Sequence, residues 1–129
     1  MALDIGSVRV GVALASSDVR IAIPYETLAM NEETFGHDIA ELVHRHSIDT
    51  IVIGYPRNQS GGSTAQTDYV ETMAKTIDAS TRIVFQDESL TSVAAAERLT
   101  VSKKAHTKAD IDAEAAAIIL QDYLETHHE

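Results

Sequence analysis

The feature that most limits the fold of this chain is a run of three strand-like segments before residue 30. Apolar and β-branched residues dominate Leu3–Ile5, Val8–Ala15 and Arg20–Leu28, and short glycine- or serine-containing connections separate these segments. Connections of this length join neighbouring antiparallel strands, so the segments predict an antiparallel meander. Pro24 has no backbone N–H to donate, which favours the edge of a sheet for the third strand.

The rest of the chain alternates between helix-like and strand-like patterns. From Asn31, which we expect to be an N-cap, apolar residues recur at helical spacing as far as Ser47. Thr50–Ile53 and Arg82–Gln86 are short apolar runs, typical of buried parallel strands. Three further helical patterns follow. One begins at Ser63 in capping-box form, the next runs from Thr91 or Ser92 to Leu99, and the last runs from about Asp110 to Leu124. This order predicts an α/β fold in which helices flank a five-stranded mixed sheet.

Length and composition fit a single domain over residues 1–129. The chain is 44% hydrophobic, which suits one core and leaves no room for a second lobe. It has no cysteine, which excludes disulfides, zinc–thiolate sites and thiol nucleophiles. No apolar run approaches the ~20 residues that span a bilayer, and the first residues lack a signal-peptide pattern. We therefore expect a soluble, cytoplasmic protein with no membrane partner.

The charge distribution is uneven. A formal net charge of -10 argues against a general nucleic-acid binder, because lysine and arginine normally supply most of such affinity. However, residues 98–109 contain no acidic side chain and hold four of the ten lysines and arginines. A solvated loop is the simplest explanation of this segment, but its place just before Asp112 also fits a local contact with nucleic acid.

Three carboxylates stand in settings that suggest a divalent-metal site. Asp4 follows Leu3 in the first strand, beside a glycine turn, and Glu88 follows the apolar run that ends at Gln86. The carboxyl ends of strands are where α/β sheets usually place their chemistry. Asp112 precedes Ala115, Ala116 and Ile119 at helical spacing, so its carboxylate should share their inward face. A carboxylate that faces inward must be paired or bound to metal.

Each of the three carboxylates also has a simpler interpretation. Asp4 can bond to backbone amides of the following turn, Glu88 can be exposed at a strand end, and Asp112 can complement the helix dipole. The neighbouring Asp87 and Asp110 are expected to turn away from the site. For any one of these carboxylates the simpler interpretation is at least as good as a metal site. The pattern of all three carboxylates together favours the metal site.

Four motifs, in order, resemble the YqgF/RuvX family over nearly the whole chain. They are Leu3-Asp4-Ile5-Gly6-Ser7-Val8-Arg9-Val10-Gly11-Val12-Ala13, Gly54-Tyr55-Pro56, Asp87-Glu88-Ser89-Leu90-Thr91, and the helical run from Asp112 to Gln121. The resemblance implies a ribonuclease H-like fold, similar to Holliday-junction resolvases. It also implies that Asp4, Glu88 and Asp112 are catalytic carboxylates that bind Mg²⁺ or Mn²⁺, with Asp4 bridging two ions by analogy with the wider fold.

Basic residues near these motifs are candidate contacts to nucleic acid. Arg9 either clamps a phosphate or lies on an outer strand face, and Gly61-Gly62 lead into a helix start that can attract an anion. The residues we expect to contact nucleic acid are Arg9, Arg57, Lys103, Lys104 and Lys108.

The chain departs from the family pattern at two points. The family usually has arginine where this chain has Ser89, so one basic contact is missing and substrate choice is in question. The first strand is also shorter than usual, with three residues before Asp4, which indicates a short central strand or a late start.

The resemblance implies a metal-dependent nuclease that processes the 5′ end of pre-16S ribosomal RNA. The first alternative is a Holliday-junction-resolving DNA endonuclease, which would normally act as a homodimer. A second alternative is a noncatalytic nucleic-acid-binding or ribosome-associated factor. An actin-like ATPase fragment ranks last, because the chain is too short for the two lobes that enclose a nucleotide. The sequence leaves monomer and homodimer, and structured RNA and branched DNA, unresolved.

Overall fold

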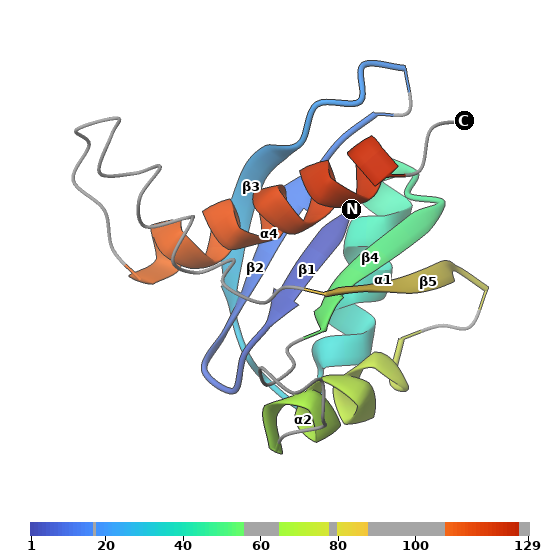
Figure 1. Cartoon of the computed structure of the whole chain (residues 1–129). Helices are drawn as coiled ribbons and strands as arrows, with labels where there is room; N and C mark the ends of the chain where they lie inside the picture. Colours follow the sequence, from blue (N-terminus) through green and yellow to red (C-terminus); the bar gives the residue numbers. More distant parts are fainter. Residues whose placement is uncertain (17, 56–64, 78–79, 88–107, 127–129) are drawn as a thin grey trace.

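In the computed structural model, the central element is a five-stranded mixed sheet (Figure 1). The structure describes residues 1–16, 18–55, 65–77, 80–87 and 108–126. The strands are β1 (Ala2–Ile5), β2 (Arg9–Leu14), β3 (Ile23–Ala29), β4 (Thr50–Tyr55) and β5 (Arg82–Asp87), in the spatial order β3-β2-β1-β4-β5. β1 is antiparallel to β2 and parallel to β4, and β4 is parallel to β5. The mixed sheet predicted from the sequence is confirmed.

The third strand is at the sheet edge, as Pro24 predicted, but it begins later than expected. Arg20 has a φ of 59°, and its backbone N–H bonds to the Ser16 carbonyl at 2.9 Å. These are features of a turn, so the strand pattern that we assigned from Arg20 onward was wrong for its first residues. β3 begins only at Ile23, and its register with β2 shifts between Val12 and Ala13.

The helices that the structure describes are α1 (Phe35–His46), α2 (Ala65–Ala74) and α4 (Lys108–Thr126). The predicted N-cap at Asn31 is wrong, because α1 begins four residues later and its N-cap is Thr34. The Asn31 side chain instead accepts a bond from the Glu33 backbone N–H at 3.0 Å and forms a local turn. The predicted end at Ser47 is confirmed by its left-handed C-cap, with a φ of 54°. The predicted helix from Thr91 or Ser92 to Leu99, and the start at Ser63, lie outside the described residues.

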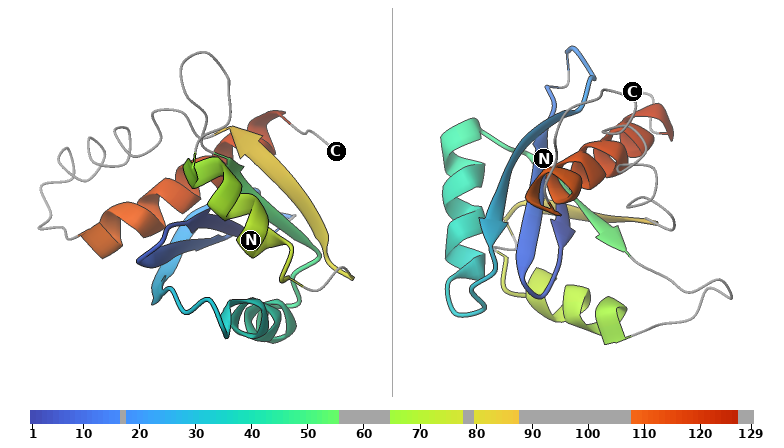
Figure 2. Two further views of the ribbon diagram at one scale, coloured as in Figure 1. Left: turned by 90° about the horizontal axis from the view of Figure 1, so that it is seen from below. Right: turned by 90° about the vertical axis from the view of Figure 1, so that its left-hand side faces the viewer.

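The sheet has a different helical cover on each face (Figures 1 and 2). Leu3 and Ile5 of β1 belong to a buried cluster with residues of α1 and α2, whereas Ala2 belongs to a second cluster with residues of α4. Alternate strand residues point to opposite faces, so β1 contributes to both clusters. This alternation puts Asp4 on the face that α4 covers. No described helix is long and apolar enough to cross a membrane.

The contact between α4 and β2 is unusually close. A Cβ atom on Gly11 would lie 2.0 Å from the carbonyl oxygen of Asp112, a distance that real Cβ contacts do not reach. Only glycine therefore lets the helix backbone sit on the strand at this point. The same contact fixes the height of Asp112 above the sheet.

We expect Gly11→Ala to lower the free energy of unfolding by about 2 kcal/mol, because the added methyl group must push α4 off β2. Urea denaturation followed by far-UV circular dichroism measures this loss as a lower midpoint. An unchanged midpoint would show that α4 does not rest on Gly11.

Candidate active site

Asp4 lies on the α4 face of the sheet, in the central strand. It is the register partner of Gly11 in the antiparallel pair of β1 and β2. Directly paired residues of antiparallel strands point to the same face, so the Asp4 side chain is directed as a Cβ on Gly11 would be, toward α4. Asp4 is half-buried. A strand in the middle of the sheet thus holds one carboxylate beneath the helix.

Asp112 reaches the same place from the other side of Gly11. It lies near the N-terminal end of α4, where its backbone carbonyl faces Gly11. The residues that follow at helical spacing, Ala115, Ala116 and Ile119, are buried, as predicted from the pattern. The structure thus brings Asp4 and Asp112, far apart in sequence, to one point on the sheet.

Arg9 forms an ion pair with Asp112. The Arg9 Nε donates to Asp112 Oδ2 at 2.7 Å, and the two side chains are 33% and 25% exposed. Arg9 is two residues before Gly11 on β2, so strand alternation puts it on the same face. Of the two sequence interpretations of Arg9, neither included a carboxylate partner. A bond through Nε leaves the terminal guanidinium nitrogens to donate elsewhere.

Glu88 lies outside the described residues, so its side chain cannot be compared with the other two. β5 ends at Asp87, which pairs in register with Tyr55, the last residue of β4. Because β1, β4 and β5 are parallel, the carboxyl ends of these three strands lie at the same end of the sheet. Within the described part of the chain, no three His, Cys, Asp or Glu side chains group together as metal ligands. The metal-binding trio remains a prediction, and the structure places two of its members, Asp4 and Asp112, next to Gly11.

Of the predicted nucleic-acid contacts, only Arg9 has a described side chain. Arg57, Lys103 and Lys104 fall outside the described residues, and for Lys108 the structure gives only its backbone position at the start of α4. The prediction of a basic contact surface stays untested at these positions.

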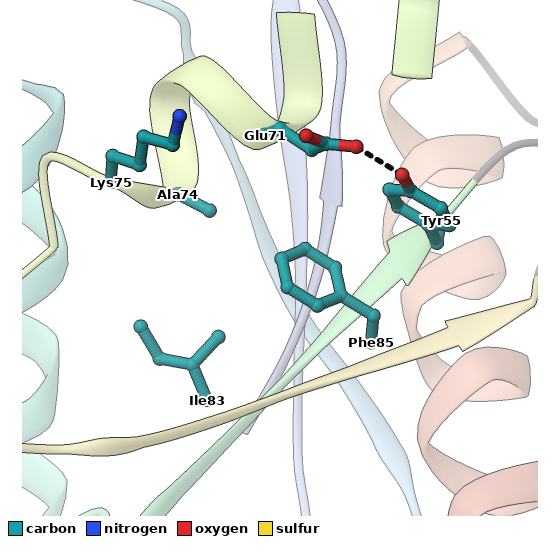
Figure 3. Close-up of a pocket in the computed structure, with 6 residues that line it drawn as sticks. All are labelled: Tyr55, Glu71, Ala74, Lys75, Ile83 and Phe85. Atoms are coloured by element: carbon teal, nitrogen blue, oxygen red, sulfur yellow. Dashed lines mark hydrogen bonds between the residues drawn. The ribbon is translucent and has the colours of Figure 1, made fainter. Parts of the chain in front are cut away.

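Two features of the structure escaped the sequence interpretation. Glu114 is only 9% exposed on α4, and its place inside a run of alanines was the one available signal of burial. A cavity of about 510 Å³ also opens between β5 and α2, on the opposite face from α4 (Figure 3). Its lining residues come from separate elements, so no local motif could have predicted it.

Known proteins resemble this chain over nearly its whole length. The chain matches, over residues 1–126, the family model described as RuvX, Holliday junction resolvase. A Chloroflexus aurantiacus protein named "Putative pre-16S rRNA nuclease" is 40% identical over 130 residues, which cover 97% of this chain and 85% of that protein. A Bacillus cytotoxicus protein of the same name is 35% identical over 137 residues, which cover 98% and 97% of the two chains.

A solved structure has the same fold. It is described as T. thermophilus RuvC in complex with Holliday junction substrate, and it aligns with a TM-score of 0.61 at 13% identity. The alignment covers 96% of this chain and 91% of that chain. At this identity the likeness concerns the fold alone, and it confirms the predicted ribonuclease H-like fold. The family match over residues 1–126, with relatives at 40% and 35% identity, shows that the chain belongs to the RuvX family.

Proposed function

We propose that this RuvX-family protein is a metal-dependent nuclease that hydrolyses phosphodiester bonds. Its proposed substrate is structured RNA, the 5′ region of pre-16S ribosomal RNA, and its proposed place of action is the cytoplasm. The observation that carries the proposal is the meeting of Asp4 and Asp112 on either side of Gly11, with Arg9 bonded to Asp112. The names of the relatives from Chloroflexus and Bacillus support the choice of RNA.

The described residues suit a hard divalent cation. Oxygen ligands are those that Mg²⁺ and Mn²⁺ prefer, and the carboxylates of Asp4 and Asp112 can supply them. Gly11 contributes no side chain there, and the Asp112 backbone carbonyl takes the place that a Cβ would occupy. When bound, such ions activate a water molecule and neutralise the charge that develops on the phosphate. We assign Asp4, Asp112 and Glu88 as the residues that hold the metal.

Arg9 has a separate role in this proposal. Its guanidinium neutralises Asp112 through Nε, and its remaining N–H groups suit the oxygens of a phosphate. A cation beside Asp112 competes with Arg9 for the same carboxylate. We therefore propose that Arg9 limits metal affinity and contacts the substrate backbone, with Arg57, Lys103, Lys104 and Lys108 as further contacts along the nucleic acid.

The second candidate function is cleavage of a four-way DNA junction. The family model bears the description Holliday junction resolvase, and the RuvC structure holds a junction. Symmetric cleavage of two strands normally requires a homodimer. Size-exclusion chromatography with light scattering separates the two functions in advance, because a strict monomer argues against paired cleavage.

We expect Asp4→Asn to reduce metal-dependent cleavage of a pre-16S ribosomal RNA leader by at least about 100-fold, because several kcal/mol of charge stabilisation are lost with the ligand. The assay compares the RNA leader with a four-way DNA junction, in Mg²⁺, Mn²⁺ and EDTA. Cleavage of the junction alone by the wild type would favour the resolvase, and no cleavage of either substrate would favour a noncatalytic binding factor.

Asp122→Asn is the matched control for this experiment. Asp122 is an exposed residue of α4 that undergoes the same chemical change well away from Gly11. We expect its cleavage rate to stay within about twofold of the wild type, and both variants to keep the wild-type circular dichroism spectrum. Equal losses in the two variants would refute the assignment of Asp4 as a ligand.

We expect Arg9→Gln to tighten Mn²⁺ binding about fivefold, because removal of a competing ion pair is worth about 1 kcal/mol. Isothermal titration calorimetry without substrate measures this affinity independently of activity. Arg45→Gln is the control, since Arg45 pairs with Glu41 on the exposed side of α1 and carries the same charge. Equal tightening in both variants would indicate a change in overall charge, and weaker Mn²⁺ binding in Arg9→Gln would contradict competition at Asp112.

A further inference from the structure

The cavity between β5 and α2 is built from two elements that meet at the edge of the sheet (Figure 3). Ile83 and Phe85 point from β5 toward α2, where Glu71 and Ala74 lie across from them. Lys75 follows the helix at the rim, with its ammonium group pointing away from the two β5 side chains. Tyr55, at the end of β4, closes one side. A volume of about 510 Å³ lies within the range of small-ligand pockets.

Phe85, an aromatic side chain that lines this cavity, is exposed to solvent. Phe85 is the parallel partner of Ile53, which is fully buried on the α1 and α2 face of the sheet. Neighbours in register share a face, so Phe85 continues this apolar surface to the edge strand, where its exposure is 45%. A large apolar side chain that remains exposed inside a cavity gains free energy when a flat apolar partner covers it.

Tyr55 and Glu71 fix the geometry around the Phe85 ring. The rings of Tyr55 and Phe85 meet edge to face, with centroids 5.2 Å apart and an interplanar angle of 62°. The Tyr55 hydroxyl donates a hydrogen bond to Glu71 Oε1 (Figure 3). This hydrogen bond and the ring contact fix the orientation of the Tyr55 side chain beside Phe85. The second oxygen of Glu71 can still accept a hydrogen bond from a ligand.

Charge complementarity favours a nucleotide as the occupant. Lys75 is exposed at the rim, where its ammonium group can pair with a phosphate. Phe85 offers a stacking surface for a base, and the Glu71 carboxylate offers an acceptor for an exocyclic amino group. A purely apolar ligand would make no polar interaction with Glu71 or Lys75, and an acidic peptide would be repelled by the Glu71 carboxylate.

We propose that this cavity binds an unpaired base of single-stranded RNA, stacked on Phe85, with the adjoining phosphate on Lys75. The inference rests on the proposed action on RNA and extends it to a specific subsite. Tyr55 pairs in register with Asp87, the residue immediately before Glu88 in the chain. Phe85 lies two residues before Asp87, about 7 Å along an extended strand. The cavity thus lies near the carboxyl ends of β4 and β5, on the opposite face of the sheet from Asp4 and Asp112.

The test measures binding of fluorescein-labelled oligo(A) and oligo(U) by anisotropy in EDTA, where the proposed metal-dependent cleavage cannot occur. We expect Phe85→Leu to weaken oligo(A) binding at least fivefold, because stacking is worth ~1–3 kcal/mol per base. Leucine keeps an apolar side chain in the cavity and removes the aromatic face, together with the ring contact to Tyr55. We expect Lys75→Gln to make the slope of log affinity against log salt concentration less negative by about 0.7, because one phosphate contact is lost. The wild type should prefer oligo(A), since uracil has no exocyclic amino group for Glu71.

Tyr25→Leu is the matched control, because Tyr25 is an exposed aromatic residue on β3, at the opposite edge of the sheet. Its oligonucleotide affinity should equal that of the wild type. Wild-type binding by Phe85→Leu, or no binding by the wild-type protein, would overturn the subsite. A wild-type dimer that Phe85→Leu converts to a monomer would instead make the cavity a contact between two copies.

These experiments distinguish failure of the proposed RNA subsite from failure of the proposed nuclease activity. If Phe85→Leu binds RNA like the wild type while metal-dependent cleavage is present, the subsite is wrong and the nuclease stands. If binding depends on Phe85 but neither nucleic acid is cleaved in Mg²⁺ or Mn²⁺, the subsite stands and the nuclease is wrong.

Discussion

The contact between Gly11 and the Asp112 carbonyl is the constraint on which the rest of the site depends. A helix normally packs on a sheet through layers of side chains, but here the backbones of α4 and β2 touch because Gly11 has no Cβ. The closeness brings the first turns of α4 down to the level of side chains on the sheet. Asp112 can then share one place with Asp4, whose side chain rises from the neighbouring strand.

The alternation of β1 makes this arrangement compatible with a stable core. Leu3 and Ile5 are buried with α1 and α2, and Asp4 between them faces α4. A register slip of one residue would bury the Asp4 carboxylate among the apolar side chains of α1 and α2 and turn Leu3 and Ile5 toward α4. The core therefore enforces the register that the carboxylate needs, and the position of Asp4 follows from the same contacts that stabilise the sheet.

Much of the fold could be predicted because its signals are local. Strand alternation and helical spacing predicted the five strands along the chain and the inward face of Asp112. The prediction was wrong at Asn31, which has the chemistry of a cap, and at Arg20, where the strand-like pattern extends into a turn. Asn31 has the chemistry of an N-cap, but its side chain closes a turn before α1 begins. The bond from Arg9 to Asp112 could not be predicted, because it joins residues 103 positions apart and depends on how closely α4 approaches β2. The Phe85 cavity depends likewise on where helical cover ends at the sheet edge.

The ion pair also bears on how an acidic protein can approach nucleic acid. With a net charge of -10, the chain repels a polyanion at long range, and two carboxylates facing one place make that repulsion strongest at the site itself. Arg9 cancels one of these charges within the protein, at a distance of 2.7 Å where screening by salt is weak. A phosphate that arrives at this site needs positive charge beyond that of Arg9, whose guanidinium is already paired with Asp112. Divalent cations between the carboxylates and the phosphate would meet this electrostatic requirement, and the carboxylate oxygens of Asp4 and Asp112 are suited to them.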